Sequence, residues 1–128
     1  MQISNSIDNT ERLAEVFAAI AHPLRIRIVR TLMHHPMCVS RLVAALEAPQ
    51  SSVSRALAML RKAGLVRRER CGAFTRYVLT DTLGGEPTAA LHDLIAALVP
   101  DTYDEEATRR RLAAQGIEPP PTPTRHDR

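Results

Sequence analysis

The side chains best suited to binding chemistry lie close together in residues 34–42, HHPMCVSRL. His34, His35 and Cys38 are ligand types for a borderline metal, and their spacing lets at least one imidazole reach the thiol. Two adjacent histidines at a helix end are also typical of a solvated last turn, where the helix dipole favours them. Alternatively, Cys38 or the second cysteine, Cys71, could be oxidised or modified, or both thiols could be silent. The residues alone leave these interpretations open.

Apolar residues at helical spacing surround this segment and must position it. Asp8 and Glu11 form a capping box that predicts the start of the first helix. The predicted helices cover residues 9–21, 23–35, 39–47 and 50–63. Gly64 then supplies a C-terminal stop. The last two helices are separated by about three residues, the proportions of a helix-turn-helix.

After Gly64 the apolar residues change to the alternation of a β-strand. Residues 65–80, LVRRERCGAFTRYVLT, are therefore predicted to form a β-hairpin that turns at CG or GA. A helix-turn-helix followed at once by a hairpin is the order of a winged helix. The expected fold class is thus mainly α with a small β-hairpin.

Positive charge is concentrated around this hairpin, although the net charge of the chain is only +3. Between residues 61 and 80, Glu69 is the single acid against these basic residues: Arg61, Lys62, Arg67, Arg68, Arg70 and Arg76. Such a segment predicts a polyanion partner that is reached by one surface. A solvated, charged hairpin without a partner is the alternative.

A further helix is predicted to begin at Pro87, with an apolar face formed by Leu91, Leu94, Ile95 and Leu98. Together with the first helix, it carries more apolar surface than one small core requires. We therefore expect two copies of the chain to dimerise through these two helices. Packing within a single domain is the alternative.

Composition and capping divide the chain into three regions. Residues 1–100 are expected to form one domain. Thr102 and Glu105 make a capping box, which predicts a short polar helix within residues 101–117. Residues 118–128 are rich in proline and poor in apolar side chains, and are expected to be a flexible tail.

Several classes of protein are excluded by what the sequence lacks. The longest apolar run, VFAAIA, is far shorter than the ~18 residues of a membrane span, and the first residues do not resemble a secretory signal. A cytoplasmic location without membrane contact is expected, in which both thiols are reduced. The sequence has no phosphate-binding glycine loop and no supported catalytic set, so an enzyme is not expected.

Three stretches together resemble the ArsR/SmtB family of bacterial winged-helix repressors: FAAIAHPLRIRIVRTL, MCVSRLVAAL and PQSSVSRALAMLRKAGLVRRERCGAFTRYVLT. The resemblance covers residues 13–80. It implies a homodimeric transcriptional repressor that binds double-stranded DNA at an imperfectly palindromic operator. A winged helix used for protein contacts is the alternative, because one fold serves several functions.

The resemblance also assigns roles to single residues. The segment PQSSVSRAL matches the family's recognition helix, so the resemblance implies that it faces the major groove. Pro49, Ala56 and Ala73 depart from the family pattern. The hairpin corresponds to the wing, although strand alternation keeps all its arginines from facing DNA together. The expected DNA contacts are Gln50, Ser51, Ser52, Ser54, Arg55, Arg67, Arg68, Arg70 and Arg76.

In the family, a signal that releases DNA is bound far from the recognition helix, often by a C-V-C-D-L motif. Here the matching residues read CVSRL, so Ser40 replaces the second thiol and Arg41 the acid. No cofactor is required, and the implied effector is a soft or borderline metal or metalloid such as As(III), or a thiol-modifying signal. In a winged helix we expect Cys38 near the hairpin base, ~20 Å from Cys71, which disfavours a bond between them.

Overall fold

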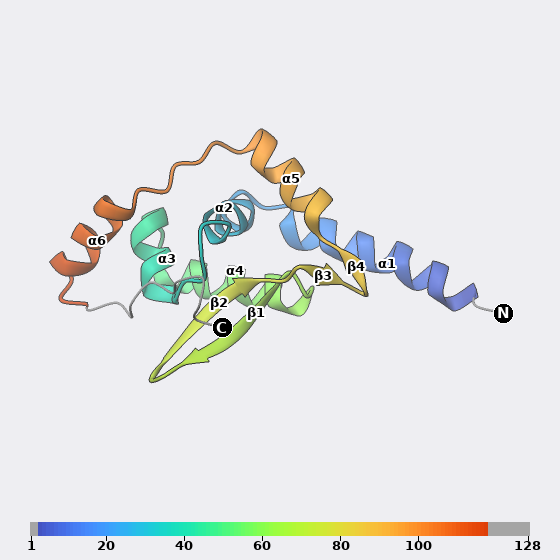
Figure 1. The fold of residues 1–128 in the computed structure, drawn as a ribbon, viewed down its shortest axis with the longest axis horizontal. Helices are drawn as coiled ribbons and strands as arrows, with labels where there is room; N and C mark the ends of the chain where they lie inside the picture. Colours follow the sequence, from blue (N-terminus) through green and yellow to red (C-terminus); the bar gives the residue numbers. More distant parts are fainter. Residues whose placement is uncertain (1–2, 118–128) are drawn as a thin grey trace.

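The computed structural model has helices first, then a β-hairpin, then two further helices, the order of a winged helix-turn-helix (Figure 1). It describes residues 3–117, so the predicted tail, residues 118–128, lies outside the described residues. The helices are α1 (Ile3–Ile20), α2 (Pro23–Leu32), α3 (Val39–Leu46), α4 (Gln50–Lys62), α5 (Ala89–Leu98) and α6 (Glu105–Ala114). The strands are β1 (Val66–Cys71), β2 (Phe74–Leu79), β3 (Thr82–Leu83) and β4 (Glu86–Pro87). None of the helices in this range has the length and apolar character needed to cross a membrane.

The start of α1 differs from the prediction, because the helix begins at Ile3 and not at residue 9. Asp8 therefore lies inside the helix, and its predicted capping role is wrong. Residues 3–8 contain neither proline nor glycine, and extending a helix by one residue costs far less than nucleating it. In Figure 1 the N-terminal part of α1 extends away from the rest of the molecule.

The core lies where α1, α2 and α4 meet the base of the hairpin. Ile28, Val53, Leu57 and Leu60 are completely buried there, and Val66 of β1 joins them. The same apolar stripe that predicted α4 thus fixes which of its faces points inward. The polar face of α4 is left on the outside.

The turn between α3 and α4 has the form expected of a helix-turn-helix. Glu47 ends α3 in the left-handed conformation, with φ of 51°. Pro49 then stands at the N-cap of α4 with no side-chain hydrogen bond to the helix. Both helices keep the predicted bounds to within one residue, so the prediction of this motif is confirmed.

The predicted hairpin is also confirmed. β1 and β2 pair antiparallel, from Val66 opposite Leu79 to Cys71 opposite Phe74. Gly72, the first of the two loop residues, has φ of 62°. A type II′ turn needs a positive φ at this position, and glycine adopts it without steric cost.

A short bridge joins the segment before α3 to the hairpin. The N–H of Met37 donates to the carbonyl of Tyr77 (3.1 Å), and the N–H of Tyr77 donates to the carbonyl of Met37 (2.7 Å). This segment therefore runs beside the middle of β2 and not beside the hairpin base. Tyr77 lies three residues from Phe74, which is opposite Cys71, so this bridge is about 10 Å along β2 from the level of Cys71.

Two predicted helix starts are wrong at the C-terminal end. Pro87 belongs to β4, and α5 begins only at Ala89, because the buried Thr88 is held by a hydrogen bond from its hydroxyl to the carbonyl of Thr80 (2.8 Å). The N-cap of α6 is Asp104, not Thr102: its carboxylate accepts from the N–H of Ala107 (3.0 Å). Two i, i+4 ion pairs lie along α6, between Glu105 and Arg109 (2.8 Å) and between Glu106 and Arg110 (3.3 Å).

Candidate nucleic-acid interface

One face of α4 is polar and open to solvent. The residues predicted to face DNA share this face: Gln50, Ser51, Ser54 and Arg55 are exposed, and Ser52 is half-buried. Hydroxyl and amide groups on such a face can approach base edges and phosphates closely, while a guanidinium offers a planar set of donors. Ala56, one of the residues that depart from the pattern of the resemblance, is buried in the core.

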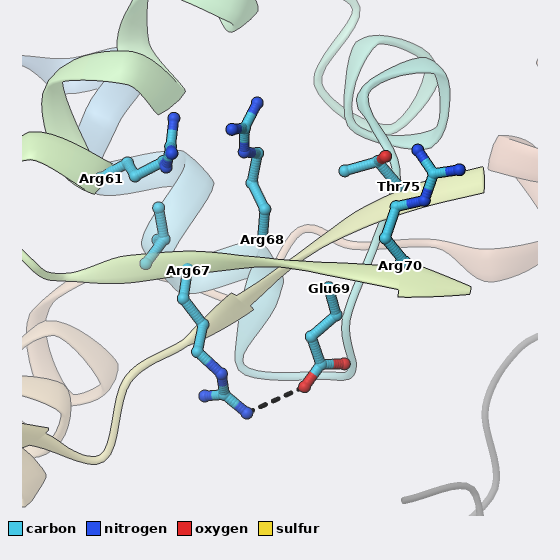
Figure 2. Close-up of a pocket in the computed structure, with 7 residues that line it drawn as sticks. Arg61, Arg67, Arg68, Glu69, Arg70 and Thr75 are labelled. Atoms are coloured by element: carbon cyan, nitrogen blue, oxygen red, sulfur yellow. Dashed lines mark hydrogen bonds and ion pairs between the residues drawn. The ribbon is translucent and has the colours of Figure 1, made fainter. Parts of the chain in front are cut away.

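The hairpin arginines divide between the two faces of the hairpin (Figure 2). Arg68 and Arg70 point to the same side as Thr75, and Arg61 reaches this side from the end of α4. These residues line an open pocket of about 620 Å³. Among residues 9–117, no hydrogen bond or ion pair engages the side chain of Arg61, Arg68 or Arg70.

The opposite face of the hairpin is occupied by internal ion pairs. The Glu69 carboxylate binds Arg67 through one oxygen (2.8 Å) and Arg76 through the other (3.3 Å). In Figure 2 the first of these pairs points away from the side that Arg68 and Arg70 share. The four arginines predicted as wing contacts are therefore not equivalent.

Arg61 is a member of this surface that the sequence reasoning missed as a contact residue. It lies seven positions after Ser54, so helical periodicity alone places both residues on one side of α4. This signal was available from the sequence. The position of the hairpin beside Arg61 was not, because it depends on the chain folding back.

Cys38 and the two histidines before it are turned toward different partners. Cys38 is at the N-cap of α3, only 7% exposed, and its Sγ lies 3.2 Å from Oγ of Ser40. His34 Nε2 lies 2.8 Å from Asp101, and His35 Nε2 lies 3.8 Å from Glu105. Among the described residues, no three His, Cys, Asp or Glu side chains lie close enough together to hold a metal ion.

Cys71 lies apart from these groups, half-buried at the end of β1 next to the hairpin turn. Both cysteines are free thiols in the structure. The hairpin and the segment before α3 thus carry one thiol each, and the Met37–Tyr77 bridge is the closest backbone connection between them.

A network around the buried Arg41 ties α3 to α6. Arg41 donates to the hydroxyl oxygen of Tyr103 (3.1 Å) and to Glu105 (2.9 Å), and the Tyr103 hydroxyl donates to Glu105. Burial alone would raise the pKa of Glu105, but hydrogen bonds from Tyr103, Arg109 and Arg41 outweigh it and lower the pKa to about 2. Burial and the bond to Glu105 raise the pKa of Tyr103 to about 12. The carboxylate is therefore charged and the phenol neutral throughout the physiological range.

An apolar groove runs along α1 and α5, the two helices predicted to dimerise. Its volume is about 460 Å³, and its lining includes Leu13, Phe17 and Leu94. These side chains are 53%, 55% and 54% exposed, and Leu98 near the end of α5 is 73% exposed. A patch of large apolar side chains is unusual on a surface that faces only water.

Comparison with known proteins agrees with this architecture. A sequence profile described as "Bacterial regulatory protein, arsR family" matches residues 22–68, which include α2, α3, α4 and the start of β1. An uncharacterized HTH-type transcriptional regulator of Methanocaldococcus jannaschii is 33% identical over 76 residues, which cover 59% of this chain and 85% of that protein. The chain belongs to the arsR family. Its fold is the family's winged helix-turn-helix.

Two other relatives of this arsR-family chain carry more specific names. A transcriptional repressor SmtB homolog of Synechocystis sp. is 38% identical over 76 residues, or 59% of this chain and 58% of that repressor. Reduced HlyU from Vibrio cholerae superposes with a TM-score of 0.62 at 26% identity, covering 77% of this chain and 100% of that structure. The chain thus matches somewhat more than half of the length of the Synechocystis repressor.

Proposed function

We propose that this arsR-family chain is a homodimeric transcriptional repressor that binds operator DNA. The observation that carries the proposal is the exposed polar face of α4 together with the cationic face of the hairpin, which Arg61 from the end of α4 shares. In this proposal Gln50, Ser51, Ser52, Ser54 and Arg55 read the major groove, while hairpin arginines bind backbone phosphates. The relative from Synechocystis is itself named a transcriptional repressor, which supports this assignment.

The dimer belongs to the same proposal. Two copies that bury the groove along α1 and α5 would remove Leu13, Phe17, Leu94 and Leu98 from water. A two-fold axis through this interface would present two copies of α4 to one side of a duplex. Half-sites about one helical turn apart, ~34 Å, would then match the two recognition helices.

The test is selection of bound sequences from a random duplex pool by the purified protein, followed by titrations at ~50 and ~200 mM salt. We expect an imperfect palindrome to be enriched, and we expect the affinity of the protein for it to fall steeply as the salt concentration rises. Arg55→Gln should weaken operator binding, whereas Arg27→Gln, the same charge change on an exposed residue of α2, should not. Salt-insensitive binding, or no enrichment, would refute the proposal and favour a protein-interaction module.

The releasing signal is proposed to act on a thiol. Cys38 opens α3, the helix that leads into α4, and it directly follows Met37, whose backbone is bonded to β2 of the hairpin. Added bulk at Cys38 would therefore strain α3 and the DNA-contacting hairpin. His34 and His35 face Asp101 and Glu105, and therefore enter this proposal only as a metal-binding alternative.

Operator release should be measured with arsenite, zinc, cadmium and peroxide for wild type, Cys38→Ser and Cys71→Ser. We expect Cys38→Ser to abolish the response to arsenite or peroxide. The matched Cys71→Ser variant controls for loss of a thiol outside α3. If both variants release the operator with every agent as wild type does, thiol sensing is excluded. If zinc is the one agent that releases the operator, the result would point to His34 and His35.

A further inference from the structure

Glu69 is the single acid on the two strands of the hairpin, and it is bound to two arginines at once. Its partners Arg67 and Arg76 lie on its own face, because Arg76 is directly opposite Glu69 in the register and Arg67 is two residues away on β1. Each carboxylate oxygen takes one guanidinium, at 2.8 Å and 3.3 Å. On this face one carboxylate therefore offsets one of the two positive charges and engages both guanidinium groups.

The other face has no such counter-charge. Arg68 and Arg70 lie there, and the register places Thr75 directly opposite Arg70. Figure 2 shows Arg61, Arg68 and Arg70 directed to one side, with the Thr75 hydroxyl next to Arg70. Three exposed guanidinium groups without a partner among the described residues, beside one hydroxyl donor, form a site for a phosphate diester.

The two faces differ in what a phosphate must displace. At Arg68 or Arg70 a phosphate displaces only water and counterions, and release of counterions favours binding. At Arg67 it must compete with a carboxylate that is already 2.8 Å away. Little is gained by exchanging one anion for another on an exposed guanidinium.

We propose that Glu69 makes the wing one-sided, so that Arg61, Arg68 and Arg70 bind the DNA backbone while Arg67 and Arg76 do not. This inference rests on the proposed function, since it takes DNA as the polyanion. Glu69 then determines specificity: a hairpin that was cationic on both faces would hold any duplex from either side, independently of α4. Because Glu69 engages the guanidinium groups of one face, it limits this sequence-independent binding.

The first test compares arginines that differ only in the face they occupy. Arg68→Gln and Arg70→Gln should each reduce the slope of log K against log salt by about 0.9, the value for one phosphate contact. Arg67→Gln is the matched control, with the same charge change on the same exposed strand, and should leave the slope unchanged. An equal loss for Arg67→Gln overturns the inference.

The second test removes the neutralising charge. Glu69→Gln should increase affinity for random-sequence DNA and steepen its salt slope by about one unit, because the exposed Arg67 becomes available. Adding Arg67→Gln should reverse part of this gain. Glu106→Gln, which removes a carboxylate 3.3 Å from Arg110 on α6, should change neither quantity. An unchanged slope for Glu69→Gln contradicts the inference.

The two proposals fail in different ways. If wild type binds every duplex without salt dependence, the proposed function is refuted and the inference with it. If DNA binding by wild type depends on salt but substitutions on the two faces of the hairpin change the salt slope equally, only the inference about Glu69 is refuted. Circular dichroism of each variant verifies that the hairpin substitutions leave the fold intact.

Discussion

At the scale of single residues, the buried Arg41 shows how a charge can be retained inside this small domain. Its side chain is only 5% exposed, and removing a guanidinium from water is costly unless every donor is satisfied by well-placed acceptors. Tyr103, in the segment before α6, and Glu105, the first residue of α6, supply acceptors for Nη1 of this side chain. The sequence could not reveal this, because the partners are separated by more than sixty positions in the chain.

We expect Glu105→Gln to destabilise the fold by about 1–2 kcal/mol at neutral pH, a value reduced for the partial exposure of this carboxylate. The pKa of Glu105 is about 2 in the folded chain against an ordinary 4.5, so the ionised group stabilises the fold above pH 4.5. That contribution is lost as the pH falls through 2. Urea titrations at neutral pH should therefore give a lower unfolding free energy for Glu105→Gln than for wild type. This difference should disappear as the pH approaches 2.

Glu106→Gln is the matched control, since Glu106 is an exposed neighbour with a single arginine partner at 3.3 Å. It should change stability by less than about 0.5 kcal/mol at either pH. A Glu105→Gln variant as stable as wild type at neutral pH would show that Arg41 is satisfied without this carboxylate.

At the scale of elements, the sequence predicts what local patterns determine. The apolar stripes of α2, α3 and α4 and the alternation in β1 and β2 locate these elements, because burying one face requires that spacing. The predicted end of α2 at residue 35 is wrong, since the helix ends at Leu32. The starts of α1, α5 and α6 were misplaced, because several residues can begin a helix and tertiary contacts select among them. Thr88, for example, is held by Thr80, and Asp104 competes successfully with Thr102 as a cap.

In the candidate interface, too, local patterns predict some features and tertiary contacts determine the others. The sequence identifies the residues on the polar face of α4, since helical spacing suffices for that. It could not show that Glu69 binds both Arg67 and Arg76, or that Arg61 reaches the hairpin, because these depend on the strand register and on how the hairpin folds back.

The docking of α6 on α3 gives a test at this scale. Leu112 is completely buried, and Arg111 donates to the carbonyl of Ala44 on α3 (2.9 Å). Leu112→Ala should therefore cost about 2–4 kcal/mol of unfolding free energy, measured by urea titration. Arg110→Ala, on the exposed side of α6, should cost less than about 0.5 kcal/mol. If both changes are equally mild, α6 is only loosely attached.

At the scale of the whole molecule, the chain carries two surfaces with opposite character. The cationic surface of α4 and the hairpin suits a polyanion, whereas the groove along α1 and α5 suits another apolar surface. Dimerisation would couple them, because two recognition helices on one rigid body bind DNA with a far higher effective concentration than two separate chains. Changes in the groove should therefore affect DNA binding without touching a DNA contact.

Phe17→Glu tests this coupling. A charge placed in the proposed interface should convert the dimer to a folded monomer, because an unpaired buried carboxylate is costly at an interface whereas Phe17 is already 55% exposed in one chain. Sedimentation should show half the mass with an unchanged circular dichroism spectrum, and operator affinity should fall by about 100-fold or more. Met59→Glu, at an apolar residue of α4 that is 42% exposed, should leave the mass unchanged. A Phe17→Glu variant that remains dimeric would place the dimer interface elsewhere on the chain.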